Sequence, residues 1–328
     1  MPIRIGIVGY GNLGRGVELA IAGQPDLALA GIYTRRAPEA LTPATPAPVR
    51  PYEDLLADDL AAAEQDLDVL ILCGGSRTDL PEQTPELAAR FTVVDSFDTH
   101  ARIPEHYEAV GAKISATTAI ISTGWDPGLF SINRVYAEAV LPTGQTSTFW
   151  GKGLSQGHSD AVRRVPGVAA GVQYTIPAPE AMEAARAGRA GEAPASSKHE
   201  RHCYVVPEDG ADPETIREAI VTMPDYFADY DTTVEFITAE ELETNHQGMP
   251  HGGFVIRSGL TSAESRQVIE YSLALGSNPE FTASVLVAYA RAAHRLHTRG
   301  AHGVFTPFDI APGLLHPADP AHLRATML

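Results

Sequence analysis

The apolar and polar positions of this chain alternate between short buried segments and helical patterns. Ile3, Ile5, Ile7 and Val8 form a short apolar run that is typical of an interior strand in a parallel sheet. The same kind of reading along the first third of the chain predicts strands at 3–8, 27–33, 69–72, 92–94 and 118–122, and helices at 13–22, 52–65, 81–90 and 104–112. Regular alternation of strands and helices favours an α/β domain with a parallel sheet.

The pattern changes after residue 126. Asp126 and Pro127 predict the start of a helix over 127–141, with Asp126 as its cap and Pro127 in its first turn. Beyond it we expect short strands at 147–150, 172–176, 202–206, 233–237 and 254–258, a helix at 180–191, and a long helix at 278–299. We therefore predict a dinucleotide-binding domain, 1–126 completed by 279–328, and a mixed α+β substrate-binding and dimerisation domain, 127–278.

A glycine motif follows the first strand. Gly9, Gly11 and Gly14 have the G-x-G-x-x-G spacing that allows a tight turn, close approach of a pyrophosphate and close helix packing. Because strand, motif and helix come in the expected order, we predict a doubly wound, Rossmann-like sheet that binds a dinucleotide. The residues between the glycines, Tyr10, Asn12 and Leu13, belong to the same predicted site.

The identity of the dinucleotide is predicted from the end of the second strand. Enzymes that use NAD place an acid there, but this chain has Thr34, Arg35 and Arg36. Two guanidinium groups can bind a 2′-phosphate, so we expect NADP. The alternative is that both arginines are ordinary surface residues.

Composition and charge exclude several partners. The chain has 328 residues, is 44% hydrophobic and 20% charged, and can bury a sizeable core. A net charge of −17 disfavours nucleic acids and anionic membranes. Cys73 and Cys203 are too few for a disulfide framework. With no apolar run of about 20 residues and a strand near the start, we expect a cytoplasmic protein.

Small and acidic residues follow the other strands of the predicted sheet. Cys73, Gly74, Gly75 and Ser76 end one strand, and small residues there allow a nucleotide to come close. Asp95 and Asp98 follow the strand at 92–94, and Trp125 and Asp126 follow the strand at 118–122. Asp98 and Asp126 could meet at one cationic substrate group. Equally, they could form an Asx turn and a helix cap.

Two glycine-rich segments, 151–160 and 249–253, are interpreted as loops, and either could be an ordinary turn. His251 stands between proline and two glycines, which favours an exposed loop. There it could contact a ligand, or it could be an ordinary surface residue. The histidine pairs 199 with 202 and 246 with 251 lack an acid at ligand spacing, so we expect no metal site.

Taken together, these residues resemble the meso-diaminopimelate dehydrogenase family, the NADP-dependent D-amino acid dehydrogenases of bacterial lysine biosynthesis. The resemblance covers almost the whole chain. Its motifs are VGYGNLGR at 8–15, the arginines at 35–36, STGWDPG at 122–128, FWG at 149–151, GLSQGHSD at 153–160, MPDYF at 223–227, GMPHGG at 248–253 and NPEFTA at 278–283. The differences, such as Gly75, the proline-rich segment 37–51 and the alanine-rich segment 181–196, concern the surface more than the site.

The resemblance implies a reaction and a set of site residues. The reaction is the reversible oxidative deamination of the D-centre of meso-2,6-diaminopimelate to L-2-amino-6-oxopimelate and ammonia, in a homodimer. Asp98 and Asp126 would hold the reacting ammonium. The other implied substrate residues are Trp125, Trp150, Gln156, Gly157, Thr175, Arg201, His251 and Asn278.

The cofactor site implied by the resemblance extends the glycine motif. It adds residues from the ends of three strands: Thr34, Arg35, Arg36, Cys73, Gly74, Gly75, Ser76, Ser96, Phe97, Asp98, Thr123, Gly124, Trp125, Asp126 and Pro127. Two other functions stay open: another NADP-dependent amino acid dehydrogenase or reductase of the same build, and a non-catalytic NADP-sensing regulator.

Overall fold

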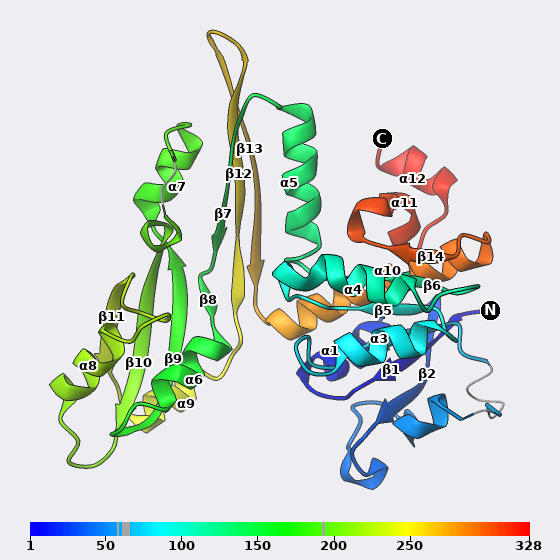
Figure 1. Cartoon of the computed structure of the whole chain (residues 1–328), viewed down its shortest axis with the longest axis horizontal. Coiled ribbons are helices and arrows are strands. Elements are labelled where there is room, and N and C mark those ends of the chain that lie inside the picture. Colours follow the sequence, from blue (N-terminus) through cyan, green and yellow to red (C-terminus); the bar gives the residue numbers. More distant parts are fainter. Residues whose placement is uncertain (58, 61–65, 192–193) are drawn as a thin grey trace. The chain divides into compact units, whose positions relative to one another are not determined.

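The computed structural model describes residues 1–57, 59–60, 66–191 and 194–328 (Figure 1). The chain divides into two compact units, which we describe separately. Unit 1 contains Met1–Ile132 and Pro279–Leu328, and unit 2 contains Asn133–Asn278. The functional domains expected from the sequence, with their boundaries and roles, stay a prediction.

Unit 1 is built on a seven-stranded parallel sheet with the order β14-β6-β5-β4-β1-β2-β3. Its strands are β1 (Ile3–Val8), β2 (Leu27–Thr34), β3 (Val49–Pro51), β4 (Val69–Leu72), β5 (Val93–Asp95), β6 (Thr118–Ile120) and β14 (Gly303–Phe305). From β1 the chain adds β2 and β3 on one side and β4 to β6 on the other. A sheet that reverses in this way binds ligands where the reversal occurs, at the carboxyl ends of β1 and β4. The predicted Rossmann-like fold is confirmed.

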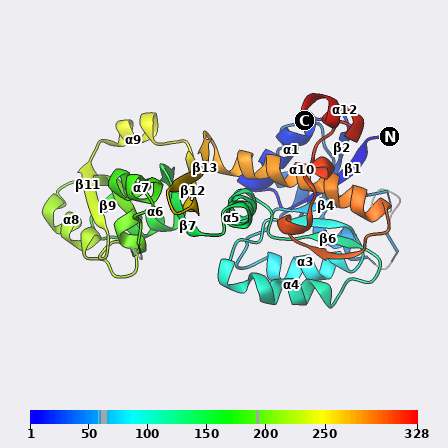
Figure 2. The same cartoon turned by 90° about the horizontal axis from the view of Figure 1, so that it is seen from above.

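Helices cover both faces of this sheet. Figure 2 shows α1 (Asn12–Ala22) and α10 (Asn278–Thr298) over one face, and α3 (Leu80–Ala88) and α4 (Ile103–Gly111) over the other. Two shorter helices, α11 (Pro312–Leu315) and α12 (Pro320–Thr326), end the chain. Because successive strand residues point to opposite faces, each central strand contributes to two cores.

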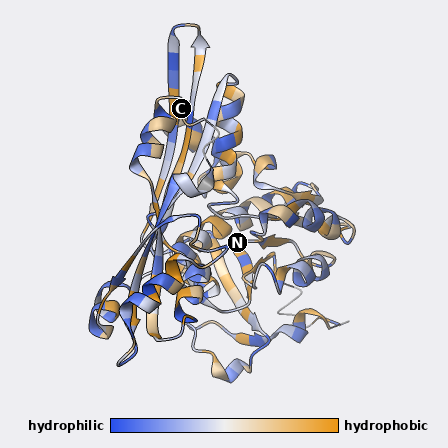
Figure 3. Ribbon diagram, turned by 60° about the vertical axis from the view of Figure 1, so that its left-hand side comes forward, coloured by the Kyte–Doolittle hydropathy of each residue, from blue (hydrophilic) through white to orange (hydrophobic). Residues whose placement is uncertain are grey.

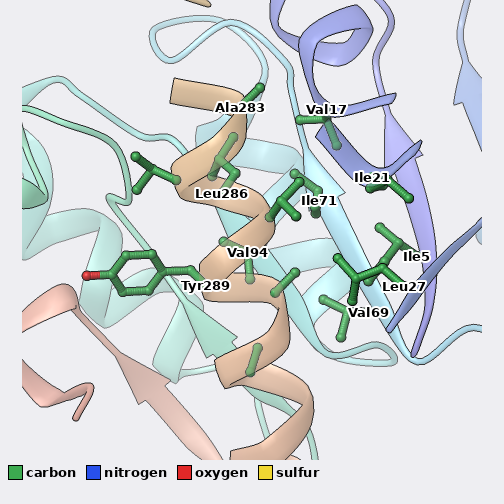
Figure 4. Packing of buried hydrophobic residues seen from close by; sticks show 14 of the residues in the cluster. Ile5, Val17, Ile21, Leu27, Val69, Ile71, Val94, Ala283, Leu286 and Tyr289 are labelled. Carbon is green, nitrogen blue, oxygen red and sulfur yellow. The ribbon is translucent and has the colours of Figure 1, made fainter. Parts of the chain in front are cut away.

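The core beneath α1 and α10 is shown in Figure 4. Val17 and Ile21 of α1 and Leu286 of α10 meet the strand residues Ile5 and Ile71, and all five are buried. The neighbours of Ile71 in β4, at positions 70 and 72, belong to the core on the opposite face. The strands of this sheet are accordingly coloured mainly as hydrophobic in Figure 3, whereas the helices carry both colours. This double burial explains why the strand sequences are continuous apolar runs.

Unit 2 contains two smaller sheets. One has the order β11-β10-β9-β8 and the other the order β13-β12-β7. The strands are β7 (Gly144–Trp150), β8 (Gly153–Leu154), β9 (Val168–Pro177), β10 (His199–Pro207), β11 (Asp231–Phe236), β12 (His251–Ser262) and β13 (Ser265–Leu275). Only the β10–β11 pair, among the strand pairs described in this unit, is parallel. The predicted mixed α+β character of this part is confirmed.

The helices of unit 2 correct two expectations. They are α5 (Leu129–Val140), which begins in unit 1, α6 (Gln156–Arg163), α7 (Pro179–Arg186), α8 (Pro213–Val221) and α9 (Ala239–Asn245). The helix expected at 127–141 starts at Leu129, so Asp126 and Pro127 precede it and are not its cap and first residue. The segment 151–160 is only partly a loop, because Ser155 caps α6 by accepting a hydrogen bond from the backbone of His158. The segment 249–253 is also only partly a loop, because His251 begins strand β12 and is partly buried.

Two other expectations are only partly met. The helix expected at 52–65 is a short 3-10 helix at Tyr52–Leu55, and residues 58 and 61–65 of that prediction lie outside the described residues. The helix expected at 180–191 is the shorter α7. Across the described ranges, the helices are too short or too polar to cross a membrane.

Arg291 of α10 ties the last part of unit 1 to its beginning. Its side chain is 3% exposed, and its Nε and Nη2 groups donate to the two carboxylate oxygens of Asp26 at 2.5 and 2.9 Å. A further bond goes to the carbonyl of Leu315 at 2.8 Å. The hydrogen bonds from Arg291 are the main cause that lowers the pKa of Asp26.

We predict that Asp26→Asn lowers the free energy of unfolding by roughly 1.5–3 kcal/mol near neutral pH, the value of a hydrogen bond to a charged group. A carboxyl whose pKa is lowered by folding stabilises above its unfolded pKa, about 3.9, and loses that contribution as pH falls through the folded value. Urea unfolding of both proteins at neutral pH and at about pH 3 measures this.

The difference between the two proteins should shrink in acid. The control is Asp66→Asn, which removes an exposed pair with Arg4 and should cost less than about 1 kcal/mol. Equal losses for Asp26→Asn and Asp66→Asn would contradict the prediction.

Candidate active site

A cavity of about 310 Å³ opens in unit 1 at the carboxyl ends of β1, β2 and β4. This is the position expected for a dinucleotide on a sheet of this order. Its lining includes many of the cofactor residues expected from the sequence: Gly9, Tyr10, Gly11, Thr34, Arg35, Arg36, Cys73, Gly74 and Gly75. Tyr52, Asp79 and Gln83 also line it, and the sequence analysis missed all three.

The turn between β1 and α1 requires two of its glycines. Gly9 has a φ of +87°, which disfavours residues with a side chain, and a Cβ on Gly14 would lie 2.3 Å from the carbonyl oxygen of Gly9. A Cβ on Gly11 would meet no atom within 4 Å. Gly11 therefore faces open space at the start of α1, whose first turn contains no acid. This cradle fits a pyrophosphate.

Glu18 holds the proline-rich segment against the glycine motif. It is buried in α1 and accepts hydrogen bonds from the hydroxyl of Tyr10 and from the backbone and side chain of Thr45, the latter two at 2.6 Å. A fourth donor, the backbone amide of Ala44, lies 3.0 Å away. The buried carboxylate of Glu18 thereby fixes Tyr10 at the cavity. The pattern of apolar and polar residues does not predict this contact.

Arg35 and Arg36 both line the cavity, and an acidic residue, Asp79, lines it beside them. The Nη2 atom of Arg35 lies 2.6 Å from Oδ1 of Asp79, and the other oxygen of Asp79 accepts from the amide of Gly75 at 2.7 Å. Burial works to raise the pKa of Asp79, yet the bonds from Gly75 and Arg35 outweigh it and keep the pKa low. An acid is therefore present after all, supplied by the segment after β4.

The side chain of Arg35 is 59% exposed and keeps donor groups for a second anion. Arg36 donates from its guanidinium to the carbonyl of Tyr10, and its amide donates to Thr34 Oγ1 at 3.1 Å. Thr34 thus shapes the turn that carries the arginines. The two guanidinium groups at the cavity fit a 2′-phosphate better than a free ribose hydroxyl.

The segments after β5 and β6 carry the other residues expected to contact substrate and cofactor. Asp98 is exposed, and its amide donates to Ser76 Oγ at 2.8 Å. Asp126 is half-buried, next to the buried Trp125, whose ring meets Phe130 edge to face at 5.3 Å. Because β5 and β6 are parallel neighbours, both acidic segments leave the same edge of the sheet.

Two of the remaining residues of the predicted cofactor site, Phe97 and Thr123, are turned inward. The side chain of Phe97 is buried and stacks on His106, with ring centroids 4.1 Å apart. Thr123 is buried and donates to the carbonyl of Asp95 at 2.6 Å. The others are Asn12, which is exposed, and Leu13 in the first turn of α1, the partly buried Ser96 before Phe97, and the buried Gly124 and Pro127 on either side of Trp125 and Asp126.

In unit 2, Thr175 and Arg201 are directly opposite each other on β9 and β10. Nη1 of Arg201 donates to Thr175 Oγ1 at 2.5 Å, and the guanidinium lies 4.0 Å from the ring centre of Tyr230. Arg201 is 8% exposed, and burial lowers its pKa. Within the described part of the chain it has no acidic partner, and its buried Nε has no acceptor. Tyr230 was not among the site residues expected from the sequence.

His251 lies beside the same pair. Gly153 pairs with Thr175 in the sheet, and a Cβ on Gly153 would lie 2.5 Å from the ring of His251. The ring accepts the amide of Gly252 at 2.8 Å through Nδ1, and burial lowers the pKa of His251. The absence of a side chain at Gly153 therefore allows His251 to reach this place.

The segment before His251 gathers more of the predicted residues. Gln156 Nε2 approaches the sulfur of Met249 at 3.3 Å, and the amide of Asn278 donates to the carbonyl of Met249 at 2.9 Å. Gly157 follows Gln156 in the first turn of α6 and faces open space. The structure thus places Gln156 and Asn278 next to Met249, two residues before His251.

Trp150 ends β7 and is stacked on His199, with ring centroids 5.6 Å apart. Its amide also donates to Nε2 of His199 at 2.9 Å, so this histidine has a structural role. Across the described residues, no group of three potential ligands is arranged to hold a metal ion.

His158 is another residue that was not expected at the site from the sequence. Its Nδ1 lies 2.8 Å from Ser155 Oγ, and its ring meets Tyr226 and Phe227 edge to face. Burial, and then the charge of Arg201, lower the pKa of His158 to about 4. A neutral imidazole fits this place, because a protonated one would be repelled by the positive charge of Arg201. The signal for His158 was the GLSQGHSD motif, which was interpreted as a loop.

Known proteins are similar to this chain over almost its whole length. Residues 124–277 match the diaminopimelic acid dehydrogenase C-terminal domain. The meso-diaminopimelate D-dehydrogenase of Lysinibacillus sphaericus is 57% identical over 328 residues, which cover 99% of each chain. The structure of the Corynebacterium glutamicum DAP dehydrogenase in complex with DAP is 49% identical, with a TM-score of 0.85 over 99% of each chain.

A further similar structure is an engineered D-amino acid dehydrogenase bound to NADP⁺, 47% identical, with a TM-score of 0.81 over 100% of each chain. The resemblance inferred from the sequence motifs is therefore confirmed along the entire length of the molecule. The chain belongs to the meso-diaminopimelate D-dehydrogenase family.

Proposed function

We propose that this chain catalyses the NADP-dependent, reversible oxidative deamination of the D-centre of meso-2,6-diaminopimelate. The products are L-2-amino-6-oxopimelate and ammonia, and the reaction serves lysine biosynthesis. The observation that carries the proposal is the combination of a dinucleotide cradle beside acidic segments in unit 1 with a buried, acid-free guanidinium in unit 2. A substrate with two ammonium and two carboxylate groups needs both kinds of partner.

The ammonium at the reacting carbon is assigned to unit 1. Asp98 and Asp126 are its proposed partners, because carboxylates are the natural acceptors for an ammonium and both follow neighbouring strands. Trp125 is proposed to form an apolar wall of the same pocket. A fixed ammonium orients the carbon that carries it, and orientation can supply much of the rate of a bimolecular reaction.

The carboxylates and the distant amino acid end are assigned to unit 2. Gln156 and Gly157 are proposed to contact the carboxylate beside the reacting carbon, with Trp150 as a second apolar wall. Thr175, Arg201, His251 and Asn278 are proposed to bind the L-configured end. The free Nε of Arg201 supports this assignment, because a carboxylate would satisfy a donor that is otherwise buried without a partner.

NADP, when bound, supplies the acceptor for the hydride that leaves the D-carbon. The residues of the chain have other tasks. The reacting nitrogen must lose a proton before the hydride leaves, and the proton passes to one of the two aspartates or to water. Water then adds to the resulting imine carbon, and ammonia leaves.

The direct test is reduction of NADP⁺ by the purified chain with meso-diaminopimelate, compared with its LL and DD isomers and with a panel of D-amino acids. Turnover of meso-diaminopimelate well above every other compound is the expected result. Preference for another amino acid would make the chain a different dehydrogenase of the same build. Tight NADP binding without ammonia-dependent NADPH oxidation would make it a sensor.

We predict that replacing Arg35 and Arg36 together by alanine weakens NADP selectively. Each charge-assisted hydrogen bond to a 2′-phosphate is worth roughly 1.5–3 kcal/mol, or about ten- to over one hundredfold in affinity. Steady-state kinetics with NADP and NAD measure the preference. The control is Arg102→Ala, which removes an exposed arginine paired with Glu105. A double variant with an unchanged preference would refute the assignment.

We predict different kinetic effects for the two ends of the substrate. Asp126→Asn should lower kcat/KM about one hundredfold or more, because the reacting carbon loses its orientation. Arg201→Met should mainly raise KM, because the distant end loses a binding group. Assays with the three isomers measure both effects. Comparable turnover of the LL and meso isomers by the wild type would argue against the proposed handedness of the pocket.

We also propose that the chain is a cytoplasmic homodimer that joins through α5. Arg134 and Glu138 on one side of this helix bond to β7, whereas Val135, Tyr136 and Val140 are each more than half exposed. Apolar side chains gathered in this way favour contact with a second apolar surface. The presence of two free thiols supports a reducing compartment.

Light scattering should accordingly give about twice the chain mass of 34.9 kDa. Tyr136→Glu should shift the protein to monomers, because the dimer would bury an unpaired charge. Phe308→Glu changes an aromatic residue in unit 1 that is also more than half exposed, and it should leave the dimer intact. A monomeric wild type would refute the proposal.

A further inference from the structure

The carboxylate of Asp95 lies at the end of β5 and is completely buried. Its Oδ1 accepts the backbone amides of Phe97 at 3.0 Å and of Ser122 at 2.8 Å. The first amide belongs to the segment that leads to Asp98, and the second to the segment that leads to Asp126. One oxygen atom therefore joins the two stretches of backbone that carry the proposed ammonium partners.

The second oxygen of Asp95 is held just as firmly. Oδ2 accepts from Thr84 Oγ1 at 2.9 Å and lies 2.7 Å from Nε2 of His106. The His106 side chain is 2% exposed, and Phe97 stacks on its ring. Four partners surround the carboxylate, so it has one orientation available to it. A buried charge with this many bonds is expensive to disturb.

The backbone of Asp95 strengthens the same link. Its carbonyl accepts both the amide of Thr123 at 3.0 Å and the Thr123 hydroxyl at 2.6 Å. Ser122, whose amide the carboxylate binds, has a φ of +57°, which is unusual for a residue other than glycine. A strained residue persists only where its surroundings fix it. Asp95 fixes it three residues before Trp125.

We propose that Asp95 is a positioning residue, which aligns the segments of Asp98 and Asp126 with each other, and that His106 and Thr84 keep its carboxylate in place. Asp95 itself does not touch the substrate in this assignment. The inference rests on the proposed function, because the role of Asp98 and Asp126 at the ammonium belongs to it. Misplacement of such groups by about 1 Å can cost one hundredfold in rate.

The test compares Asp95→Ala with Asp95→Asn. The asparagine keeps an oxygen that can accept the amides of Phe97 and Ser122, whereas alanine leaves both without a partner. We expect kcat/KM for meso-diaminopimelate, per NADP-binding site counted by titration, to fall about one hundredfold or more in Asp95→Ala and less than about tenfold in Asp95→Asn. His106→Leu, which removes one clamp on Oδ2, should fall between them.

A purely structural role predicts a different outcome. The control is Asp26→Asn, which breaks a largely buried ion pair elsewhere in unit 1 and should lower the unfolding temperature while leaving kcat per site unchanged. If Asp95→Ala lost stability to a similar extent with kcat/KM per site within about twofold of the wild type, the positioning role would be overturned. Equal losses in Asp95→Ala and Asp95→Asn would also overturn it.

Hydrogen exchange supplies a readout that needs no turnover. Peptides covering 96–99 and 122–127 should exchange at least about tenfold faster in Asp95→Ala, whereas peptides of α10 should not change. Unchanged exchange in both segments would refute the inference. A wild type that shows slow exchange in these segments but does not oxidise meso-diaminopimelate would instead contradict the proposed function alone. If Asp95→Ala does not fold, the same comparison uses Asp95→Asn and His106→Leu.

Discussion

The close packing of helix α1 is the constraint on which unit 1 depends. On one side, Gly14 lies so near the carbonyl of Gly9 that a Cβ would approach it to 2.3 Å. On another side, a Cβ on Gly16 would lie 2.9 Å from Ala283 and 3.2 Å from the carbonyl of Pro279, both in α10. Strand β1, the motif helix and the long C-terminal helix therefore form one block. The residues after 278 belong to unit 1 because α10 completes this block.

The sequence predicted this block because its signals are local. Apolar runs, glycine spacing and helical periodicity each lie within a few residues of the element that they specify. Contacts that join distant segments leave no such signal. Asp79 reaches Arg35 from 44 positions away, and Tyr230 meets Arg201 only because β10 and the chain around β11 come together. For this reason the local sequence around Arg35 could not indicate the acid that pairs with it.

Some elements were missed because their patterns are weak. Strand β13 (Ser265–Leu275) has apolar residues at every second position from 269 to 275, but its first three residues are polar and Val268 on the exposed face interrupts the alternation. Helix α6 begins with Gln156 and Gly157 and was interpreted as a loop, since glycine usually marks a turn. The cap by Ser155 outweighs this local preference. In both cases tertiary packing decides between two structures that the local sequence allows.

Two buried arginines in unit 2 differ in how fully the structure satisfies their hydrogen-bond donors. Arg257 is 4% exposed, and its Nε, Nη1 and Nη2 groups donate to the carbonyl of Leu141, the hydroxyl of Thr146 and the carbonyl of Pro142. Arg201 is buried to a similar degree but has an Nε without an acceptor among the described residues.

An unsatisfied buried donor costs about 1–3 kcal/mol, and the cost is larger for a charged group. A fold that needed Arg201 only for its own stability would gain by supplying an acceptor, as it does for Arg257. Thr175 Oγ1 and the face of Tyr230 hold the guanidinium in place without neutralising it. The charge of Arg201 therefore remains available for an anion, and a carboxylate with two parallel acceptors is the anion that best matches a guanidinium fixed in this way.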